Sequence, residues 1–175
     1  MIHTIAIPQK PYEYLHSTYE PDAEYVDGVI EERPMVEHDH ALWQGALVYW
    51  FWSHDREWKI RALPEVRVQI SPTRFRVPDL AVLDRKASIE QIVTRPPIAA
   101  FEILSPENQM SRMLVKLADY AAMGISNIFV VDPETRIAYR FVAGGLIRSS
   151  EKELLVGSKA EIDWAKLIER IADAH

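Results

Sequence analysis

Two short apolar runs of the 175-residue sequence each carry one acidic residue. The first run, residues 77–83, contains Asp79, and the second, residues 100–106, contains Glu102. A carboxylate inside a buried strand is costly to desolvate unless a charged group lies against it. If the two strands are neighbours in one sheet, the two acids repel each other, and a divalent cation held by both relieves the repulsion. The alternative is that each acid lies at a strand end, where it is solvated or capped.

A basic segment precedes the first of these runs. Residues 56–76 hold six basic residues against two acidic ones, a local balance of +4 in a chain whose net charge is −6. The basic residues are Arg56, Lys59, Arg61, Arg67, Arg74 and Arg76. The overall charge argues against nucleic-acid binding by the whole surface, but it leaves room for a local basic groove. The segment is either a phosphate-facing patch or the solvated rim of a hairpin.

The composition is that of a globular protein, with 48% hydrophobic and 26% charged residues. The length predicts a single domain over residues 1–175. Cysteine is absent, which excludes disulfides, thiolate zinc sites and a cysteine nucleophile. We see neither a secretory signal in residues 1–10 nor an apolar run long enough to cross a bilayer, and therefore expect a cytoplasmic protein without a membrane partner.

Other common catalytic motifs are missing from the sequence. The six glycines are scattered and form no phosphate-binding loop. There is no His-Glu-x-x-His zinc motif, and Ser105 lacks the Gly-x-Ser-x-Gly setting of a hydrolase nucleophile.

The N-terminal part predicts an irregular arm over residues 1–11, a short helix over 12–19 and a hairpin over 24–32. Asp27-Gly28 favours the tight hairpin turn because glycine accepts a positive φ. A long helix over residues 37–53 follows and is apolar almost all round, so it must be buried on more than one side. A second helix from a partner subunit would cover it and predicts a homodimer; a helix deep in the core explains the same pattern.

His40 and Gln44 share one face of this helix near its start. A polar pair on an otherwise apolar helix predicts side chains that face the site of the two acids. An N-terminal polar turn is the alternative.

The middle of the chain alternates strands and helices. Strands are expected over residues 58–63, 65–70, 75–83 and 98–104, the last of them central because it is the most apolar, and a helical turn is expected around 88–93. A helix over residues 109–123, capped by Gly124, leads into a strand over 128–131. This strand–helix–strand unit predicts a right-handed crossover with two parallel strands. Three further strands, 136–142, 146–149 and 153–156, and a helix over 164–172 complete an α/β (α+β) fold.

Several short motifs, taken together, resemble those of a known family. They are Glu24-Tyr25-Val26-Asp27-Gly28, Val77-Pro78-Asp79, Glu102-Ile103-Leu104-Ser105-Pro106, the helix with Lys116 and Tyr120, and Gly124 leading into Val130-Val131-Asp132-Pro133. Over residues 14–141 the chain resembles the bacterial putative restriction endonuclease family, also known as a domain of unknown function, within the PD-(D/E)XK nuclease superfamily. The spacings together are specific, whereas Pro-Asp alone is not.

The resemblance implies a restriction-endonuclease-like core that cleaves phosphodiesters, with DNA as the expected partner. Asp79 corresponds to the first acid of the superfamily motif and Glu102 to the second, and both would bind Mg²⁺ or Mn²⁺. The superfamily places a lysine two residues after the second acid. Here Leu104 occupies that position, which is a clear departure.

Lys116 offers a replacement for the missing lysine. Glu102 lies about 7 Å below the strand end at about 3.3 Å per residue, and Lys116 lies about 12 Å down the following helix at about 1.5 Å per residue. The two heights differ by less than the reach of a lysine, so Lys116 is predicted to face the metal. The alternative is a surface lysine on an amphipathic helix.

Three further residues are weaker candidates. Glu65 would help hold a metal if its strand lies next to that of Asp79; otherwise it pairs with Arg67 or Arg76. Arg67 is a candidate as part of the basic segment. Arg112, near the start of the second long helix, either meets a phosphate or pairs with Glu107.

The expected function is therefore that of a metal-dependent endonuclease. Two alternatives stay open. One is a catalytically silent nuclease fold that binds or regulates, suggested by Leu104 and the acidic charge. The other is a metal-dependent phosphoesterase that acts on small nucleotides and needs no basic patch.

Overall fold

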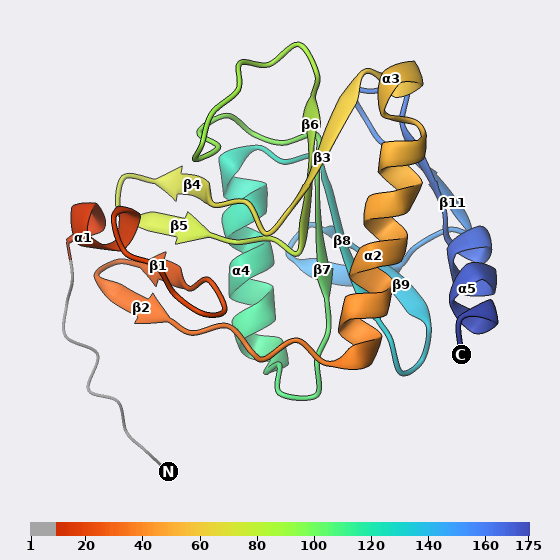
Figure 1. Ribbon diagram of the computed structural model, residues 1–175, viewed down its shortest axis with the longest axis horizontal. Helices are drawn as coiled ribbons and strands as arrows, with labels where there is room; N and C mark the ends of the chain where they lie inside the picture. The colour runs from red at the N-terminus through yellow and green to blue at the C-terminus, as the bar shows by residue number, and fades with distance from the viewer. Residues whose placement is uncertain (1–9) are drawn as a thin grey trace.

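A six-stranded sheet forms the centre of the computed structural model, which describes residues 10–175 (Figure 1). Its strand order is β10-β9-β8-β7-β6-β3. The strands are β3 (Ile60–Pro64), β6 (Leu80–Asp84), β7 (Ala99–Ile103), β8 (Asn127–Asp132), β9 (Ile137–Val142) and β10 (Gly145–Arg148). All five residues of β7 are buried, so the most apolar predicted strand does lie inside the sheet.

The β7–α4–β8 unit is the predicted parallel crossover. Strands β7 and β8 pair in parallel, and α4 (Met110–Met123) connects them. Helix α4 ends at Gly124, whose φ of +101° suits glycine because no Cβ opposes it. On its other side β7 pairs antiparallel with β6, with Leu80 opposite Phe101. Extending this register by one residue brings Asp79 opposite Glu102.

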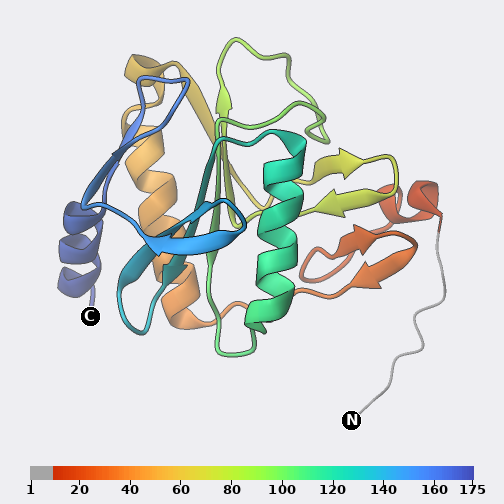
Figure 2. The ribbon, with the colours of Figure 1, turned by 180° about the vertical axis from the view of Figure 1, so that it is seen from behind.

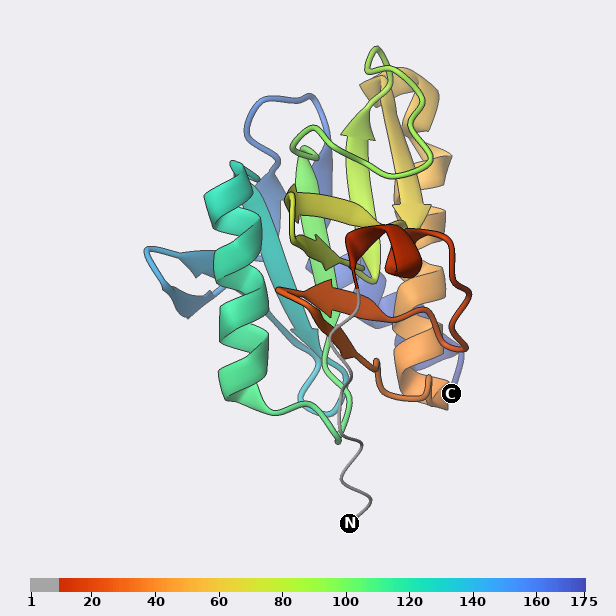
Figure 3. The same ribbon diagram turned by 90° about the vertical axis from the view of Figure 1, so that its left-hand side faces the viewer.

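Helices cover both faces of the sheet (Figures 1 and 2). Helices α2 (His38–Ser53) and α5 (Trp164–Asp173) pack on one face, where Phe51, Phe101 and Leu167 belong to one core cluster. Helix α4 packs on the other face through Leu117 and other apolar residues. Figure 3 shows the strands between α4 and α2. Helix α4 therefore faces the side of β7 that carries Glu102.

A smaller sheet lies beside α4 (Figure 1). Its order is β2-β1-β5-β4, formed by β1 (Glu24–Val26), β2 (Val29–Glu31), β5 (Arg74–Arg76) and β4 (Val68–Ser71). Strands β1 and β2 form the predicted hairpin, with positive φ at both Asp27 and Gly28. Tyr14, Tyr25 and Phe75 pack beneath it. This sheet brings the hairpin next to the C-terminal end of β7, since residues of both line one cleft.

Helix α2 is buried on two sides by the chain itself. Leu47 and Phe51 belong to the same core cluster as β7 and as Leu167 and Ile171 of α5. The apolar pattern that predicts a partner helix is thus explained largely by α5. Of the apolar residues of α2, Tyr49 and Trp52 are 55% and 59% exposed. The homodimer stays a prediction that now depends on this smaller surface.

Two strand predictions are wrong in ways that affect the site. The strand expected over residues 75–83 is two strands, β5 and β6, in different sheets, because Pro78 has no N–H for a sheet ladder. The strand expected over residues 65–70 begins only at Val68, since Glu65 has a φ of +53° and lies in a turn. Strand β4 therefore does not neighbour β6. Glu65 instead follows β3, whose Pro64 lies opposite Leu80 of β6, and extending this register by one residue brings Glu65 opposite Asp79.

Smaller differences lie at element ends. Helix α1 (Pro11–Leu15) is shorter than the expected 12–19, and Trp58 ends helix α3 (Asp55–Trp58) instead of starting a strand. No helix forms around residues 88–93, where Val93 instead bridges to Val68. The strand expected over residues 153–156 is β11 (Lys152–Leu154). It pairs with β12 (Glu161–Asp163), a strand that the sequence pattern did not indicate.

The predicted irregular arm, residues 1–11, falls outside the described residues except for its last two positions, and Pro11 already belongs to α1. Within residues 10–175, no helix has the length and apolar character that crossing a lipid bilayer requires.

Asp163 provides a test of how α5 is anchored. Its side chain accepts a hydrogen bond from the Lys166 amide at 3.1 Å, so Asp163→Ala should lower the free energy of unfolding by about 1 kcal/mol. Asp173→Ala, an exposed change at the other end of α5, is the matched control and should have little effect. Urea titrations measure both.

The same pair of variants carries a pH dependence. Burial raises the pKa of Asp163. The Lys166 amide and the Lys152 ammonium lower it by more than burial raises it, so the net pKa lies below 3.8. The stabilisation is therefore full above that value and is lost as the pH falls through the lower folded pKa. A destabilisation by Asp163→Ala that grows on acidification would contradict this assignment.

Candidate active site

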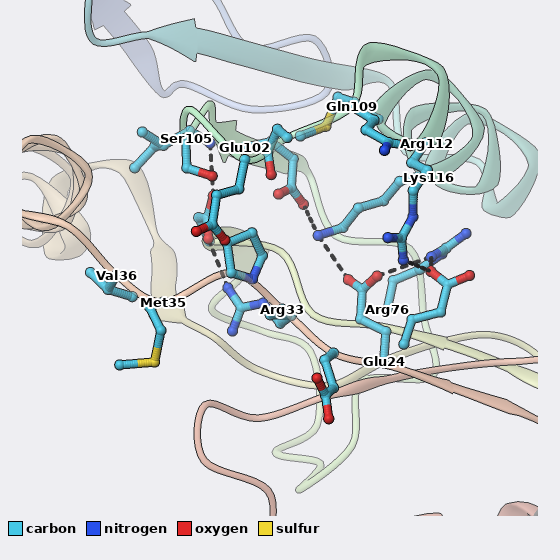
Figure 4. A pocket seen from close by; sticks show the side chains of 18 of the residues that line it. Glu24, Arg33, Met35, Val36, Arg76, Glu102, Ser105, Gln109, Arg112 and Lys116 are labelled. Atoms are coloured by element: carbon cyan, nitrogen blue, oxygen red, sulfur yellow. Dashed lines mark hydrogen bonds and ion pairs between the residues drawn. The ribbon is translucent and has the colours of Figure 1, made fainter. Parts of the chain in front are cut away.

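A cleft of about 850 Å³ lies between the hairpin of the smaller sheet and the C-terminal end of β7. Its walls come from β2 and the segment after it, from the first turn of α2, and from the first turns of α4. Asp79, Glu102 and Lys116 all line it. Figure 4 shows Glu102 and Lys116 in the cleft. The cleft thus gathers the three residues that the sequence predicts to act together.

Asp79 is 3% exposed and is held by four residues, from β7, α2 and the segment before α2. Its Oδ2 accepts hydrogen bonds from the Ile103 amide at 2.7 Å, in β7, and from His40 Nε2 at 3.2 Å, in α2. Its Oδ1 accepts from Arg33 Nη2 at 2.8 Å. The side chain of Gln44 donates to the Asp79 backbone carbonyl at 2.9 Å. His40 and Gln44 therefore face the site, as predicted, and the structure shows that they orient Asp79.

Glu102 is 2% exposed, and α4 supplies its partners. Its Oε1 accepts from Lys116 Nζ at 2.8 Å and from the Tyr120 hydroxyl at 2.6 Å. Lys116 therefore leans from α4 over β7, as the height estimate predicts. Tyr120, whose pattern indicates packing alone, both packs in the core and fixes this carboxylate.

Glu24 is a site residue that the sequence reasoning missed. It is 5% exposed, and its Oε1 accepts from Lys116 Nζ at 2.7 Å and from the Val77 amide at 2.9 Å. Lys116 also donates to the Val77 carbonyl at 3.1 Å. One ammonium thus ties the hairpin, α4 and the β5–β6 link together. The signal available was the acid at the head of the Glu24–Gly28 motif, in a strand with buried neighbours.

Arg76 forms a second layer beneath this contact. It is 3% exposed and binds Glu24 Oε2 at 2.9 Å, Glu31 Oε2 at 3.1 Å and Asp119 Oδ2 at 2.7 Å. Each nitrogen of the Arg76 guanidinium contacts a carboxylate. Arg76 thus holds Oε2 of Glu24, while Lys116 holds Oε1.

The two carboxylates of the predicted motif differ in pKa. Burial raises the pKa of Asp79. The hydrogen bond from His40 and the charges of His40, Lys116 and Arg33 lower it by more than burial raises it, so the net pKa is below the usual value. Burial raises the pKa of Glu102 to about 7, and the nearby Lys116 offsets only part of this. For Lys116, burial lowers the pKa, but Glu102 and Glu24 raise it above 10.5, which keeps the amine charged.

Of the three weaker candidates, Arg112 lines the cleft, and Glu65 and Arg67 do not. Arg112 lines the cleft mouth with a 60% exposed side chain, and its ion pair is with Glu31 at 3.5 Å, not with Glu107. Glu65 lies 3.5 Å from Arg33 and does not line the cleft. Arg67 is outside the cleft, where it binds Asp22 at 2.6 Å and the ring of Tyr14. The structure therefore brings Arg112 to the site and leaves Arg67 away from it.

Four of the six basic residues of the segment bind partners within the protein, and Arg56 and Lys59 are exposed. Arg67 pairs with Asp22, Arg74 with Asp27 and Asp119, and Arg76 with three carboxylates. Arg61 donates to the backbone carbonyls of Arg85 and Ala87. These arginines stabilise the fold internally, so removing them cannot separate a nuclease from a small-nucleotide phosphoesterase.

The donor set at the cleft fits a magnesium ion that shares its ligands with substrate. Asp79 and Glu102 offer hard oxygens, and Glu102 Oε2 takes part in no hydrogen bond or ion pair described within residues 10–175. Mg²⁺ commonly binds one or two carboxylates and completes its shell with water and phosphate. Over the described residues, no group of three or more His, Cys, Asp and Glu side chains could hold a metal ion.

Comparison with known proteins places the chain. The model of the family Uma2, described as putative restriction endonuclease, matches residues 11–158. A structure of a putative nuclease belonging to DUF820 from Anabaena variabilis is similar, with a TM-score of 0.78 and 20% identity over 94% of this chain and 99% of that one. At this identity the likeness shows a shared fold.

A second similar structure is that of a DrdV–DNA complex, with a TM-score of 0.44 and 14% identity over 74% of this chain and 11% of that one. That likeness is too low to support an argument. No curated protein matches the chain significantly.

Removing the Lys116 amine should strongly destabilise the protein. Lys116→Met leaves Glu24 and Glu102 buried without their shared cation, which should cost about 3–5 kcal/mol of unfolding free energy. Lys86→Met, on an exposed turn, is the control and should change it by less than about 0.5 kcal/mol. Equal effects of the two changes in urea titrations would show that the buried contact does not form.

The raised pKa of Glu102 predicts a pH dependence of stability. The unfolded chain releases this proton near pH 4.5 and the folded chain near 7, so the contribution of Glu102 is full below the first value and is lost as the pH rises through the second. Glu102→Gln removes this titration. In metal-free buffer its unfolding free energy relative to the native protein should therefore rise from about pH 5 to about pH 8. A difference that stays constant or falls over this range would exclude a raised pKa.

Proposed function

Because the chain belongs to the putative restriction endonuclease family Uma2, we propose that it is a divalent-metal-dependent endonuclease that hydrolyses phosphodiester bonds in DNA. The observation that carries the proposal is the meeting of Asp79, Glu102 and Lys116 in one cleft, with Lys116 Nζ 2.8 Å from Glu102. Asp79 and Lys116 lie 37 positions apart in the chain. Packing needs alone do not gather such residues around buried charge, because burying charge is costly.

Asp79 and Glu102 are the proposed ligands of Mg²⁺ or Mn²⁺. A bound ion would polarise the scissile phosphate and lower the pKa of an attacking water. Asp79 is suited to this task because its depressed pKa keeps it ionised, and Ile103 N–H, His40 and Arg33 fix its orientation. Glu102 is suited because its Oε2 stays available while Oε1 is held by Lys116 and Tyr120.

Lys116 supports catalysis over the silent alternative. The departure at Leu104 motivated that alternative, and Leu104 indeed packs against the core cluster under α4. Lys116 nevertheless brings an ammonium to Glu102 from the helix that follows. Since its pKa is raised, Lys116 is a fixed positive charge at neutral pH and not a general base. Its role would be to hold Glu102 and Glu24 and to offset charge that develops on the phosphate.

Glu24 is a further proposed member of the site. Its carboxylate shares the Lys116 ammonium with Glu102, and Arg76 holds it from below. Its net pKa is lowered, because Lys116 and Arg76 outweigh the effect of burial, so it is ionised at neutral pH. By competing for Lys116 it sets how strongly that amine binds Glu102.

The proposal predicts which changes stop cleavage. Asp79→Asn and Glu102→Gln should each lower the rate of Mg²⁺-dependent DNA cleavage by about 1,000-fold or more, equivalent to about 4 kcal/mol of transition-state stabilisation. Asp84→Asn, an exposed change at the far end of β6, is the control and should retain activity. Cleavage by both variants at the native rate, with circular dichroism showing all three folded, would overturn the proposal.

A further inference from the structure

Unsatisfied polar atoms are concentrated in the cleft. Within residues 10–175, the buried side-chain nitrogen and oxygen atoms that lack a hydrogen-bond partner are Arg33 Nη1, His40 Nδ1 and Ser105 Oγ. All three residues line the cleft. Leaving such an atom unpaired costs about 1–3 kcal/mol, so native proteins keep few of them. Their gathering at one place indicates a polar ligand that supplies the missing partners.

Arg33 is the cation among the three, and its guanidinium makes fewer hydrogen bonds than it has donors. Its side chain is 10% exposed, yet the hydrogen bond described for it is the one from Nη2 to Asp79. Nη1 lies 3.5 Å from Glu65 Oε1, which is too far for a good hydrogen bond. A guanidinium carries five N–H donors in a planar fork that matches two oxygens of a phosphate.

The other buried cations of the cleft, Lys116 and Arg76, already bind buried carboxylates through each of their nitrogen atoms. The three donors of Lys116 go to Val77 O, Glu24 and Glu102. The Nε, Nη1 and Nη2 atoms of Arg76 each contact a carboxylate. Either of them would have to release a buried carboxylate before it could bind substrate. Figure 4 shows Lys116 reaching between Glu24 and Glu102, with Arg33 on the other side of the pocket.

We propose that Arg33 is the phosphate-binding residue of this cleft, donating from Nη1 to a non-bridging oxygen of a phosphodiester beside Asp79. The inference deepens the proposed nuclease function by naming the group that recognises the substrate backbone. Ser105 Oγ, also unpaired and buried, is a second donor for the same ligand. Arg33 lies in the irregular segment between β2 and α2, so its position is set by its contact with Asp79 and not by a sheet or helix.

A binding experiment without catalysis tests this directly. The probe is the dinucleotide TpT, which has one phosphodiester, titrated in EDTA and followed by NMR, including the arginine Nε–H resonances. Its uncharged methylphosphonate analogue serves as the second probe. The native protein should bind TpT about 10-fold to 100-fold more tightly than the analogue, the range expected for hydrogen bonds to a charged group.

Arg33→Gln should lose this preference and bind both probes equally, and Arg33→Lys should restore part of it through its charge. Arg85→Gln, which removes an exposed arginine outside the cleft, is the matched control and should keep the preference within about threefold. An Arg33→Gln variant that stays folded and still prefers TpT would overturn the inference, because a merely structural role predicts that outcome.

The result is separable from the nuclease proposal. If the native protein binds TpT through Arg33 but cleaves no DNA with Mg²⁺ or Mn²⁺, the phosphate site stands and the nuclease proposal fails. If it cleaves DNA but Arg33→Gln leaves the TpT preference intact, the nuclease proposal stands and Arg33 has no part in binding.

Discussion

The shared contact of one ammonium, that of Lys116, with Glu24 and Glu102 is the constraint on which the rest of the structure depends. It joins the hairpin strand β1 to the central strand β7 and to α4, both of which lie much later in the chain. Taking these charges out of water is costly, and mutual attraction offsets that cost only when geometry and further hydrogen bonds are good. Here Tyr120, the Val77 backbone and Arg76 provide those hydrogen bonds. The buried charges are therefore held by a complete network on one side.

The opposite side of the cleft is less complete, and this asymmetry suits a binding site. Asp79 is fixed by the Ile103 amide and by His40, but Arg33, His40 and Ser105 each keep one buried atom that has no hydrogen-bond partner among residues 10–175. The break between β5 and β6 at Pro78 makes both sides possible. Val77 turns its amide and carbonyl toward Glu24 and Lys116, and two residues later Asp79 turns its carboxylate toward β7. A continuous strand would have committed these backbone groups to a sheet ladder.

The sequence predicted the parts of the site that lie on regular elements. The apolar run of β7 fixes Glu102, and the rise of α4 brings Lys116 to its height. Glu65 was misplaced because a positive φ ended the alternating pattern before β4 began. Arg67, Arg74 and Arg76 were read as a local patch, whereas their acidic partners come from more than 40 residues away and leave no local trace. Glu24 and Arg33 escaped for the same reason, since each acts through a contact across two elements.

Anomalous diffraction from crystals grown with Mn²⁺ tests the central claim most directly, because it locates the ion without depending on activity. The account predicts one strong peak within coordination distance of both the Asp79 and the Glu102 carboxylates, with Lys116 still in contact with Glu102. Well-ordered density for the cleft with no peak there at millimolar Mn²⁺, or a peak that only one of the two acids can reach, would contradict it.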